Sequence, residues 1–504
     1  MLLILLAGIL AYANSFSVPF LFDDGYFILD PRSQAFFWPL WKVFIPPPHF
    51  QPWVHRPLVT LTLAINHLTC GPDPWGYHVV NLAIHLANGL LLLALLRRRI
   101  RPGPALAAAL LWTVHPLNTE GVTYIWQRAE SLMALCTLLT LYCLTRASES
   151  PGWKWKLLAT AACAAGMMGK QTMVVVPALA LLIDRIFLAG SWKKLWQERG
   201  RLHLALMATW GIIAAFLLAA SRNGVPSNAG LSYHEITPWE YFRSQPGALL
   251  HYLRLAFWPE PLVFDYGWPV ANGLGVVLPG LIVLALLGLT AWLLWRRPAV
   301  GFLGAWCFII LSPVSTIFAT GEIVTEHRMY LPLMAVLTAA VLAASHLLRD
   351  RNRLAVLLTC LAATALTAAT IRRNEDYQSA VSLWEDTVAK RPANYRAHSN
   401  LATAYLREKQ AARAIPHFRE AIRLNPGNPQ ARNNFAVALL KVGYIEEAMQ
   451  QLQEAVRLDP KQPESRRILD QIYRISGRSP APARSSAPSA DPAPPGRPAD
   501  PPAR

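Results

Sequence analysis

The feature that most constrains this 504-residue chain is a series of long apolar runs that extends from its first residue to about residue 371. Most are close to the roughly 20 residues that a helix needs to cross a bilayer. The runs lie at about 1–13, 77–96, 103–118, 130–145, 156–169, 172–188, 202–220, 274–295, 299–317, 331–348 and 354–371. With 53% hydrophobic and only 15% charged residues, the chain is predicted to be an all-α membrane protein with about 11 spans.

Basic residues gather in short connections between these runs. The clusters lie at 97–101, 154–156, 193–201, 296–297 and 349–353. They fall on alternate connections, and the positive-inside rule makes that face cytoplasmic. The formal net charge of +17 is therefore explained by topology, and a nucleic-acid partner is rejected.

The first apolar run has neither a basic start nor a convincing cleavage site, so we expect a first span and not a signal peptide. None of the six cysteines stands in a CxxC pair, and all but Cys70 lie in apolar runs. Neither a disulfide framework nor a zinc site is indicated. We expect no metal and no cofactor.

Beyond residue 372 the composition becomes that of a soluble helical segment with a period of 34 residues. The positions that recur are Ala397, Asn400, Ala402, Ala404, Leu406, Ala414, Ala421, Leu424 and Pro426. Small residues allow close helix packing and the final proline ends the second helix, a pattern typical of tetratricopeptide repeats. Such a stack offers a groove for a protein or peptide; the alternative is that it only caps the membrane domain.

The sequence thus divides into a membrane domain at 1–371, repeats at 372–477 and a tail at 478–504. The tail consists mainly of Pro, Ala, Ser and Arg. Such a composition cannot bury a core, so we expect the tail to be disordered.

Two adjacent carboxylates, Asp23 and Asp24, stand where the first apolar run gives way to a long aromatic loop. Acids at a membrane surface suggest chemistry, although an interfacial residue or a helix cap is the alternative. The loop also holds His55 and Arg56. Its stretch from about 56 to 68 is too short to cross and should lie flat in the interface.

His78, Asn81 and His85 are spaced i, i+3 and i+7, which places them on one face of a helix. Because polar groups are costly in lipid, that face should look into the protein or a wet cavity. For Asn81 and His85 a satisfied interhelical hydrogen-bond network is favoured over direct chemistry.

Later connections on the same outer side add further acids and cations. They are His115 with Glu120, then Arg128 with Glu130, Lys170, Asp265 in a long loop at about 221–272, and Glu326, His327, Arg328 and Tyr330. Charges at membrane level indicate function by default. For each residue alone, anchoring or ion pairing remains an alternative to catalysis.

An outer cavity with two carboxylates and several cations suits transfer of a sugar from a lipid-linked phosphate. The cations can neutralise the departing phosphate while a carboxylate takes the proton of an acceptor hydroxyl. No glycine-rich nucleotide motif is visible in the sequence, and a donor dissolved in the membrane needs none.

On these residues the chain resembles a known family: the transmembrane, tetratricopeptide-repeat-containing O-mannosyltransferases and their bacterial relatives in the glycosyltransferase C superfamily. The resemblance covers nearly everything to about residue 475. It rests on the following motifs: Phe22-Asp23-Asp24, Arg56-Pro57-Leu58, Tyr77-His78 with Asn81 and His85, His115-Pro116 with Glu120 and Arg128, Lys170, and Arg328 to Pro332, followed by the repeats.

The resemblance implies that Asp23 or Asp24 is the catalytic base, without choosing between them. It implies donor-phosphate binding by Arg128, Lys170 and Arg328. Supporting or acceptor-side roles would fall to His55, Arg56, His78, His115, Glu120, Asp265, Glu326, His327 and Tyr330. Lys170 is followed by Gln171, where relatives often carry an acid, so a role for an acid there is in doubt.

The resulting hypothesis is an integral-membrane glycosyltransferase with inversion at the anomeric carbon. It would move a sugar, such as mannose, from a polyprenyl-phosphate donor to a hydroxyl acceptor, protein Ser or Thr, on the extracytoplasmic face. The alternatives are a non-enzymatic membrane scaffold that positions the repeats, and a polymerase or ligase of surface glycans. The expected location is a bacterial inner membrane, with the site and the repeats facing the periplasm.

Overall fold

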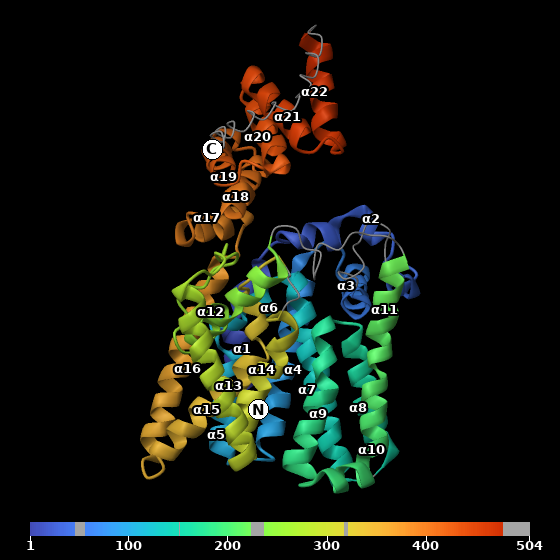
Figure 1. Cartoon of the computed structure of the whole chain (residues 1–504), viewed down its shortest axis with the longest axis vertical. Helices are drawn as coiled ribbons and strands as arrows, with labels where there is room; N and C mark the ends of the chain where they lie inside the picture. The colour runs from blue at the N-terminus through green and yellow to red at the C-terminus, as the bar shows by residue number, and fades with distance from the viewer. Residues whose placement is uncertain (46–55, 151, 223–235, 317–320, 477–504) are drawn as a thin grey trace, which may run out of the picture. The chain divides into compact units, whose positions relative to one another are not determined.

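The structure is a computed structural model that describes residues 1–45, 56–150, 152–222, 236–316 and 321–476. All regular structure in these residues is helical, which confirms the all-α prediction. The chain divides into two units, Met1–Glu408 and Lys409–Arg504, and Figure 1 labels the helices of both.

Five helical segments of the first unit are long and apolar enough to cross a membrane. They are Pro74–Leu96 (α4), Ile125–Glu149 (η6 with α7, Arg128–Glu149), Gln171–Leu188 (η7, α9 and η8), Leu274–Arg296 (α13) and Asn352–Glu375 (α16). Shorter apolar helices are Leu2–Ser17 (α1 with η1), Pro57–Cys70 (α3), Pro298–Val314 (α14 with η10) and Pro332–Leu347 (α15). The total of about 11 spans remains a prediction.

The remaining apolar runs form α5 (Pro102–Thr113), α8 (Trp153–Met167), α10 (Trp192–Ala208) and α11 (Trp210–Arg222). Helix α7 packs against both α4 and α8, and α5 packs against α4 and α15. Their shared interior is continuous, with Trp112, Met133 and Leu144 among its buried members. The α3 helix matches the stretch expected to lie flat, although its orientation to the bilayer remains a prediction.

The sequence predicts a long loop at 221–272, but α12 (Pro238–Phe257) occupies its centre. Thr237 and Glu240 form a capping box that starts the helix, and such a box satisfies two otherwise unpaired amides. The buried face carries Tyr241, Ala248 and Tyr252. Because polar and charged residues interrupt its sequence, α12 has no continuous apolar run and was not recognised.

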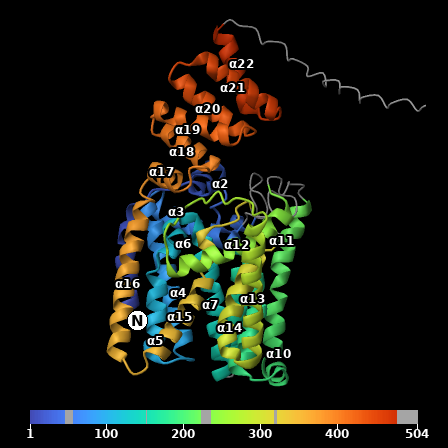
Figure 2. The same ribbon diagram turned by 60° about the vertical axis from the view of Figure 1, so that its left-hand side comes forward.

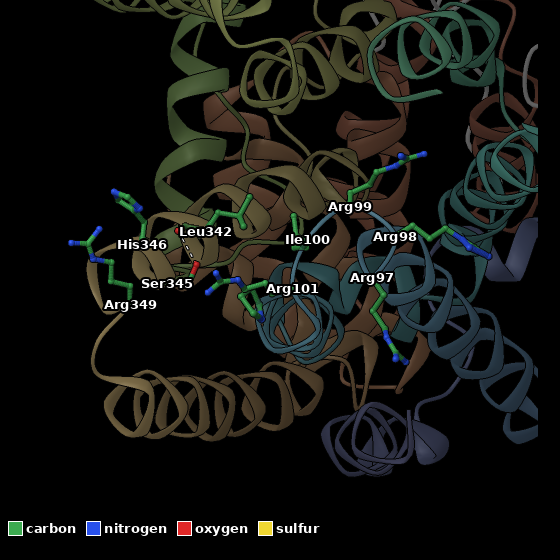
Figure 3. A pocket seen from close by; sticks show the side chains of 10 residues that line it. Arg97, Arg98, Arg99, Ile100, Arg101, Leu342, Ser345, His346 and Arg349 are labelled. Atoms are coloured by element: carbon green, nitrogen blue, oxygen red, sulfur yellow. Dashed lines mark hydrogen bonds between the residues drawn. The ribbon is translucent and has the colours of Figure 1, made fainter. Parts of the chain in front are cut away.

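The two ends of the helical bundle differ in what they carry. Figures 1 and 2 show α2 (Pro31–Gln34), α6 (Thr119–Thr123) and α12 at one end, and the α15–α16 connection at the other. The basic turn at Arg97–Arg101 lies at that second end, because it lines one pocket together with Arg349 (Figure 3). Basic clusters and the acids of the first loop are thus separated along the bundle.

A buried ion pair joins η8 (Asp184–Leu188) to α10. Arg199 donates from Nε and Nη2 to the two oxygens of Asp184, each at 2.8 Å, and from Nη1 to Glu198. His203 Nε2 lies 2.7 Å from Asp184 Oδ2. Asp184 is fully buried and Arg199 is nearly so, which makes this pair a closed structural link.

Helices α17 (Ala380–Lys390) and α18 (Tyr395–Arg407) belong to the first unit, so this unit continues past the last apolar helix. Trp384 of α17 contacts the rings of Phe22 and Phe264. At the start of α18, Arg396 pairs with Asp265 at 2.7 Å. Aromatic and charged contacts therefore fix these two helices to the loops that carry the outer acids.

In the second unit, α19 (Ala411–Leu424), α20 (Pro429–Lys441), α21 (Ile445–Leu458) and α22 (Pro463–Ser476) pack each against the next. Buried alanines Ala414, Ala421, Ala436 and Ala448 stand at the repeating small-residue positions. This stack has the nearest-neighbour packing of a solenoid.

Candidate active site

Asp24 is almost completely buried, and both of its carboxylate oxygens accept backbone hydrogen bonds. The donors are the amides of Leu21 at 2.9 Å and Trp126 at 2.8 Å. Burial raises the pKa of Asp24, while these two bonds oppose the shift. The Asp24 carboxylate therefore joins the first loop to the segment before α7, and its oxygens are occupied.

Asp23 is only half-buried and is held differently. Its backbone amide donates to the Tyr124 hydroxyl at 3.0 Å, and the same hydroxyl bonds its carboxyl group. Burial raises the pKa of Asp23 to about 6, whereas Tyr124 and the charge of Arg56 lower it. Phe22, with a φ of 40°, turns the chain just before it. Of the two acids, Asp23 has the more available carboxylate.

Arg56, at the N-cap of α3, is the cation next to Asp23. Its Nε and Nη1 atoms are buried without a hydrogen-bond partner among the described residues. The guanidinium lies 5.5 Å from the centre of the Trp126 ring and interacts electrostatically with Asp23 and Glu130. Buried donors without acceptors are costly, so this site is suited to an anionic ligand.

Lys170 forms a buried ion pair with Glu130, at the start of α7. The ammonium group also lies within electrostatic range of Arg56 and Arg328. Acids and cations therefore share this site, with Glu130 paired to Lys170 and Asp23 beside Arg56. The structure thus brings Lys170 into the same neighbourhood as Arg56 and Asp23.

Arg128 is fully buried, and its donors are occupied by the protein. Nε donates to Asn81 and Nη1 to Asn66, both at 2.6 Å, while Nη2 donates to the carbonyl of Tyr77 at 2.9 Å. These bonds join α7 to α3 and α4. The side chain has the contacts of a structural crosslink, not those of an open phosphate site.

The guanidinium group of Arg328 also donates hydrogen bonds within the protein. Nη1 donates to the carbonyl of Ile323 at 3.0 Å and to the Tyr241 hydroxyl at 3.2 Å, and Nη2 donates to the carbonyl of Glu322 at 2.8 Å. Its charge nevertheless reaches Lys170. Arg328 therefore holds the 322–328 segment and adds positive potential to the site.

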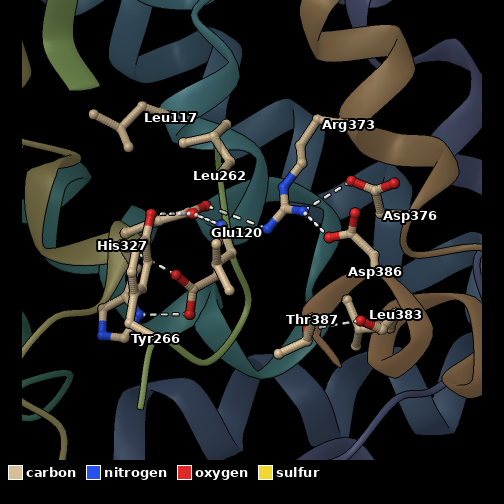
Figure 4. Close-up of polar contacts among 12 residues, drawn as sticks. Leu117, Glu120, Leu262, Tyr266, His327, Arg373, Asp376, Leu383, Asp386 and Thr387 are labelled. Carbon is tan, nitrogen blue, oxygen red and sulfur yellow. Dashed lines mark hydrogen bonds and ion pairs between the residues drawn. The ribbon is translucent and has the colours of Figure 1, made fainter. Parts of the chain in front are cut away.

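His327 and Glu120 form a dyad on the side of the site nearest η11 (Glu326–Met329). Glu120 accepts from the His327 amide at 2.9 Å and from its Nδ1 at 2.7 Å (Figure 4). Burial raises the pKa of Glu120 to about 7, and burial with the charge of Lys170 lowers the pKa of His327. The His327 imidazole is therefore neutral and is held in one orientation.

Glu326 lies in a neighbouring ion-pair network, while Asp265 pairs separately with Arg396. Glu326 accepts from the Tyr266 hydroxyl at 2.9 Å, and burial raises its pKa to about 7. Arg373, 3.5 Å from Glu326, lies between Asp376 and Asp386 (Figure 4). This network connects the outer loops to α16 and α17.

The remaining predicted residues lie in the interior. His78 donates to the carbonyl of Val18 at 2.8 Å, and His115 donates to the carbonyl of Ala256 at 3.2 Å. The Tyr330 hydroxyl bonds His85 at 2.7 Å and Asn88 at 3.2 Å. The His85 contacts are those of an interhelical hydrogen-bond network. His55 lies outside the described residues.

The structure therefore brings Asp23, Arg56, Lys170, Glu120 and His327 into one electrostatic neighbourhood. Sequence reasoning assigned no role to the Tyr124 hydroxyl or to Trp126, because an aromatic residue in a membrane protein gives no distinctive signal. No group of three or more His, Cys, Asp or Glu side chains suited to a metal occurs in the described residues.

Two parts of the chain match known protein families. Residues 52–219 match a family described as dolichyl-phosphate-mannose-protein mannosyltransferase. Residues 372–429 and 405–472 match tetratricopeptide repeats. The resemblance inferred from the sequence motifs is thereby confirmed, and with its apolar helices the chain is a multi-pass membrane protein.

Among curated proteins, the chain is 32% identical over 286 residues to protein O-mannosyl-transferase tmtc2 of Xenopus laevis, with 51% of this chain and 34% of that protein covered. It is 26% identical over 492 residues to protein O-mannosyl-transferase TMTC4 of Mus musculus, covering 82% of this chain and 64% of the relative. The chain thus spans about a third to under two thirds of the length of these two relatives. Among solved structures, ArnT from Cupriavidus metallidurans bound to undecaprenyl phosphate has 16% identity and a TM-score of 0.45, covering 91% of this chain and 79% of that one.

Proposed function

We propose that this chain, a relative of the protein O-mannosyl-transferases, is a glycosyltransferase that moves a sugar from a polyprenyl-phosphate donor to a protein hydroxyl group. The observation that carries the proposal is the buried Arg56 guanidinium, whose Nε and Nη1 lack partners among the described residues beside the Asp23 carboxyl group. An anionic donor supplies the missing acceptors, and the acid supplies the base.

Asp23 is the base in this reaction. The acceptor oxygen attacks the anomeric carbon as the bond from that carbon to the phosphate oxygen breaks. The proton of the hydroxyl passes to Asp23, and the electron pair of the broken bond leaves on the polyprenyl phosphate. Attack opposite the leaving group inverts the anomeric centre. A carboxylate with a pKa of about 6 accepts a proton more readily than an ordinary aspartate near neutral pH.

Arg56 and Lys170 receive the phosphate, because negative charge grows there in the transition state. Arg328 contributes long-range positive potential, and Arg128 holds α3, α4 and α7 in place. The dyad of Glu120 and His327 keeps a neutral imidazole beside the cations, where it orients the acceptor or the sugar. Supporting this division, Arg128 has its donors occupied whereas Arg56 does not.

The side of the membrane to which the site opens follows from the separation of charges along the helical bundle. If the basic turns face the cytoplasm, as the positive-inside rule requires, Asp23 and Arg56 open to the extracytoplasmic side. In a bacterium this is the periplasmic face of the inner membrane. The repeat helices favour a protein acceptor, because such stacks bind peptides and proteins.

The test is incubation of the purified full chain with labelled polyprenyl-phosphate mannose and related sugar donors, followed by separation of protein from glycolipid. We expect label in protein for the wild type and a loss of roughly 10²- to 10⁴-fold for Asp23→Asn. Asp30→Asn, in the same loop, is the matched control and should retain activity. Label only in glycolipid would indicate a glycan polymerase or ligase; no transfer from any donor would support a scaffold.

A further inference from the structure

A second charged site lies away from Asp23, at the turn between α4 and α5. Its cavity of about 750 Å³ is lined by the Arg97–Arg101 turn and by His346 and Arg349 at the end of α15. No acidic residue lines it. In Figure 3 the Arg101 side chain extends toward Ser345.

The positive charge of this site exceeds what the protein itself neutralises. Arg98 pairs with Glu149 at 3.2 Å and Arg349 with Asp350 at 3.4 Å. The C-termini of α4 and α15 together supply about one negative charge. Against the five lining arginines this leaves about two positive charges without a counter-charge.

Arg97 and Arg101 are the cations that remain available. Neither side chain has a hydrogen bond or ion pair within the described part of the chain, whereas Arg99 donates to the carbonyl of Phe187 at 3.0 Å. Guanidinium groups without protein partners favour an anion, because their donors match the oxygens of a phosphate.

The surroundings favour a lipid as the source of that anion. The candidate spans α4 and α16 end and begin at this level, at Leu96 and Asn352, which places it at a membrane surface. Just beyond the cations, Leu347 is 81% exposed, and Val356 and Leu357 are also exposed. A polar phosphate group and apolar chains would each find a matching surface.

We propose that this pocket binds the phosphate headgroup of an anionic phospholipid, with its acyl chains along the exposed leucine and valine side chains of α15 and α16. The site is separate from the sugar-transfer site and does not depend on the identity of donor or acceptor. The positive-inside rule requires basic residues on one side of the membrane but does not require a pocket. Topology alone therefore does not explain this site.

The test uses native mass spectrometry of the purified full chain with phosphatidylglycerol and phosphatidylcholine of the same acyl chains. We expect preferential retention of phosphatidylglycerol. Each of Arg97→Gln and Arg101→Gln should weaken it by about fivefold, since a juxtamembrane arginine contributes about 1 kcal/mol. Both side chains are exposed, so neither substitution threatens folding.

Arg296→Gln is the matched control, because it removes an arginine from another basic turn, outside the pocket, and should leave binding unchanged. An equal loss in this variant would show diffuse attraction to the basic face and overturn the proposal. Equal retention of phosphatidylcholine would overturn it as well. Displacement of the lipid by equimolar glycerol 3-phosphate would identify a free anion as the ligand, contrary to the proposal.

Discussion

Two buried arginines in the first unit, Arg199 and Arg56, differ in whether their hydrogen bonds are complete. Around Asp184, both carboxylate oxygens and all three guanidinium nitrogens of Arg199 have partners. Around Asp23, Arg56 keeps two buried nitrogens without a partner in the described residues. Unpaired buried polar groups cost stability, and under the proposed function Arg56 binds the donor phosphate whereas Arg199 maintains the fold.

The largest expected effect comes from Arg199, whose three guanidinium nitrogens all have partners. Arg199→Met removes three hydrogen bonds and leaves Asp184 buried with its charge, so we expect a loss of about 3–5 kcal/mol in the free energy of unfolding. Thermal unfolding in detergent measures it, and transfer per folded molecule should not change. Arg201→Met, exposed on the same helix, is the control. Wild-type stability of Arg199→Met would remove the basis of the comparison.

Substitution of Arg56 should instead lower the transfer rate and leave the stability nearly unchanged. Arg56→Gln removes a charge that stabilises the departing phosphate, and we expect the transfer rate to fall by roughly 10²- to 10³-fold. The unfolding temperature should stay near that of the wild type, because few bonds are lost. Arg32→Gln, exposed in the same loop, serves as the control. A stability loss as large as that of Arg199→Met would instead make Arg56 structural.

Acidification sharpens the assignment of the base. With its pKa raised to about 6, Asp23 is ionised at pH 7.5 and becomes protonated below pH 6, so kcat/KM should fall about tenfold per pH unit there. Glu120, with a pKa of about 7, is the competing group. Glu120→Gln should therefore keep the fall near pH 6. If the fall disappears in this variant, Glu120 and not Asp23 controls the profile.

The smallest effect comes from an ion pair of intermediate exposure. The Arg396 side chain is 28% exposed, and its partner Asp265 is 6% exposed. Arg396→Gln should cost about 1 kcal/mol of stability, because solvent screens the pair, with transfer activity retained. Thermal unfolding of this variant beside Arg199→Met provides the measurement. An equal loss of stability in the two variants would show that burial does not determine which ion pair stabilises the protein more.

Hydropathy and the repeat period were sufficient for the all-α class, for most apolar helices and for the tetratricopeptide segment. The α12 helix was missed because polar and charged residues interrupt the apolar pattern that identifies spans. The first unit also extends to Glu408, since Arg396 and Trp384 contact residues from much earlier in the chain. Such contacts join residues more than 100 positions apart and leave no local pattern.

For the site, the sequence identified charged residues at one level but treated them alike. The Asp24 carboxylate accepts from the amide of Trp126, 102 residues away, whereas Asp23 meets the hydroxyl of Tyr124. Arg128 and Arg56 differ because Asn66 and Asn81 reach the first and not the second. Partners of this kind come from other helices, and side-chain geometry decides which cation remains open.

The contact of Trp384 with Phe22 and Phe264 has a practical consequence for protein engineering. A truncation after residue 371 would remove α17 and leave these aromatic rings exposed to water beside Asp23. A truncation after Glu408 would keep the contacts with Trp384. If the repeats bind the acceptor, as proposed, they could be exchanged beyond that point to change the acceptor while the first loop is left intact.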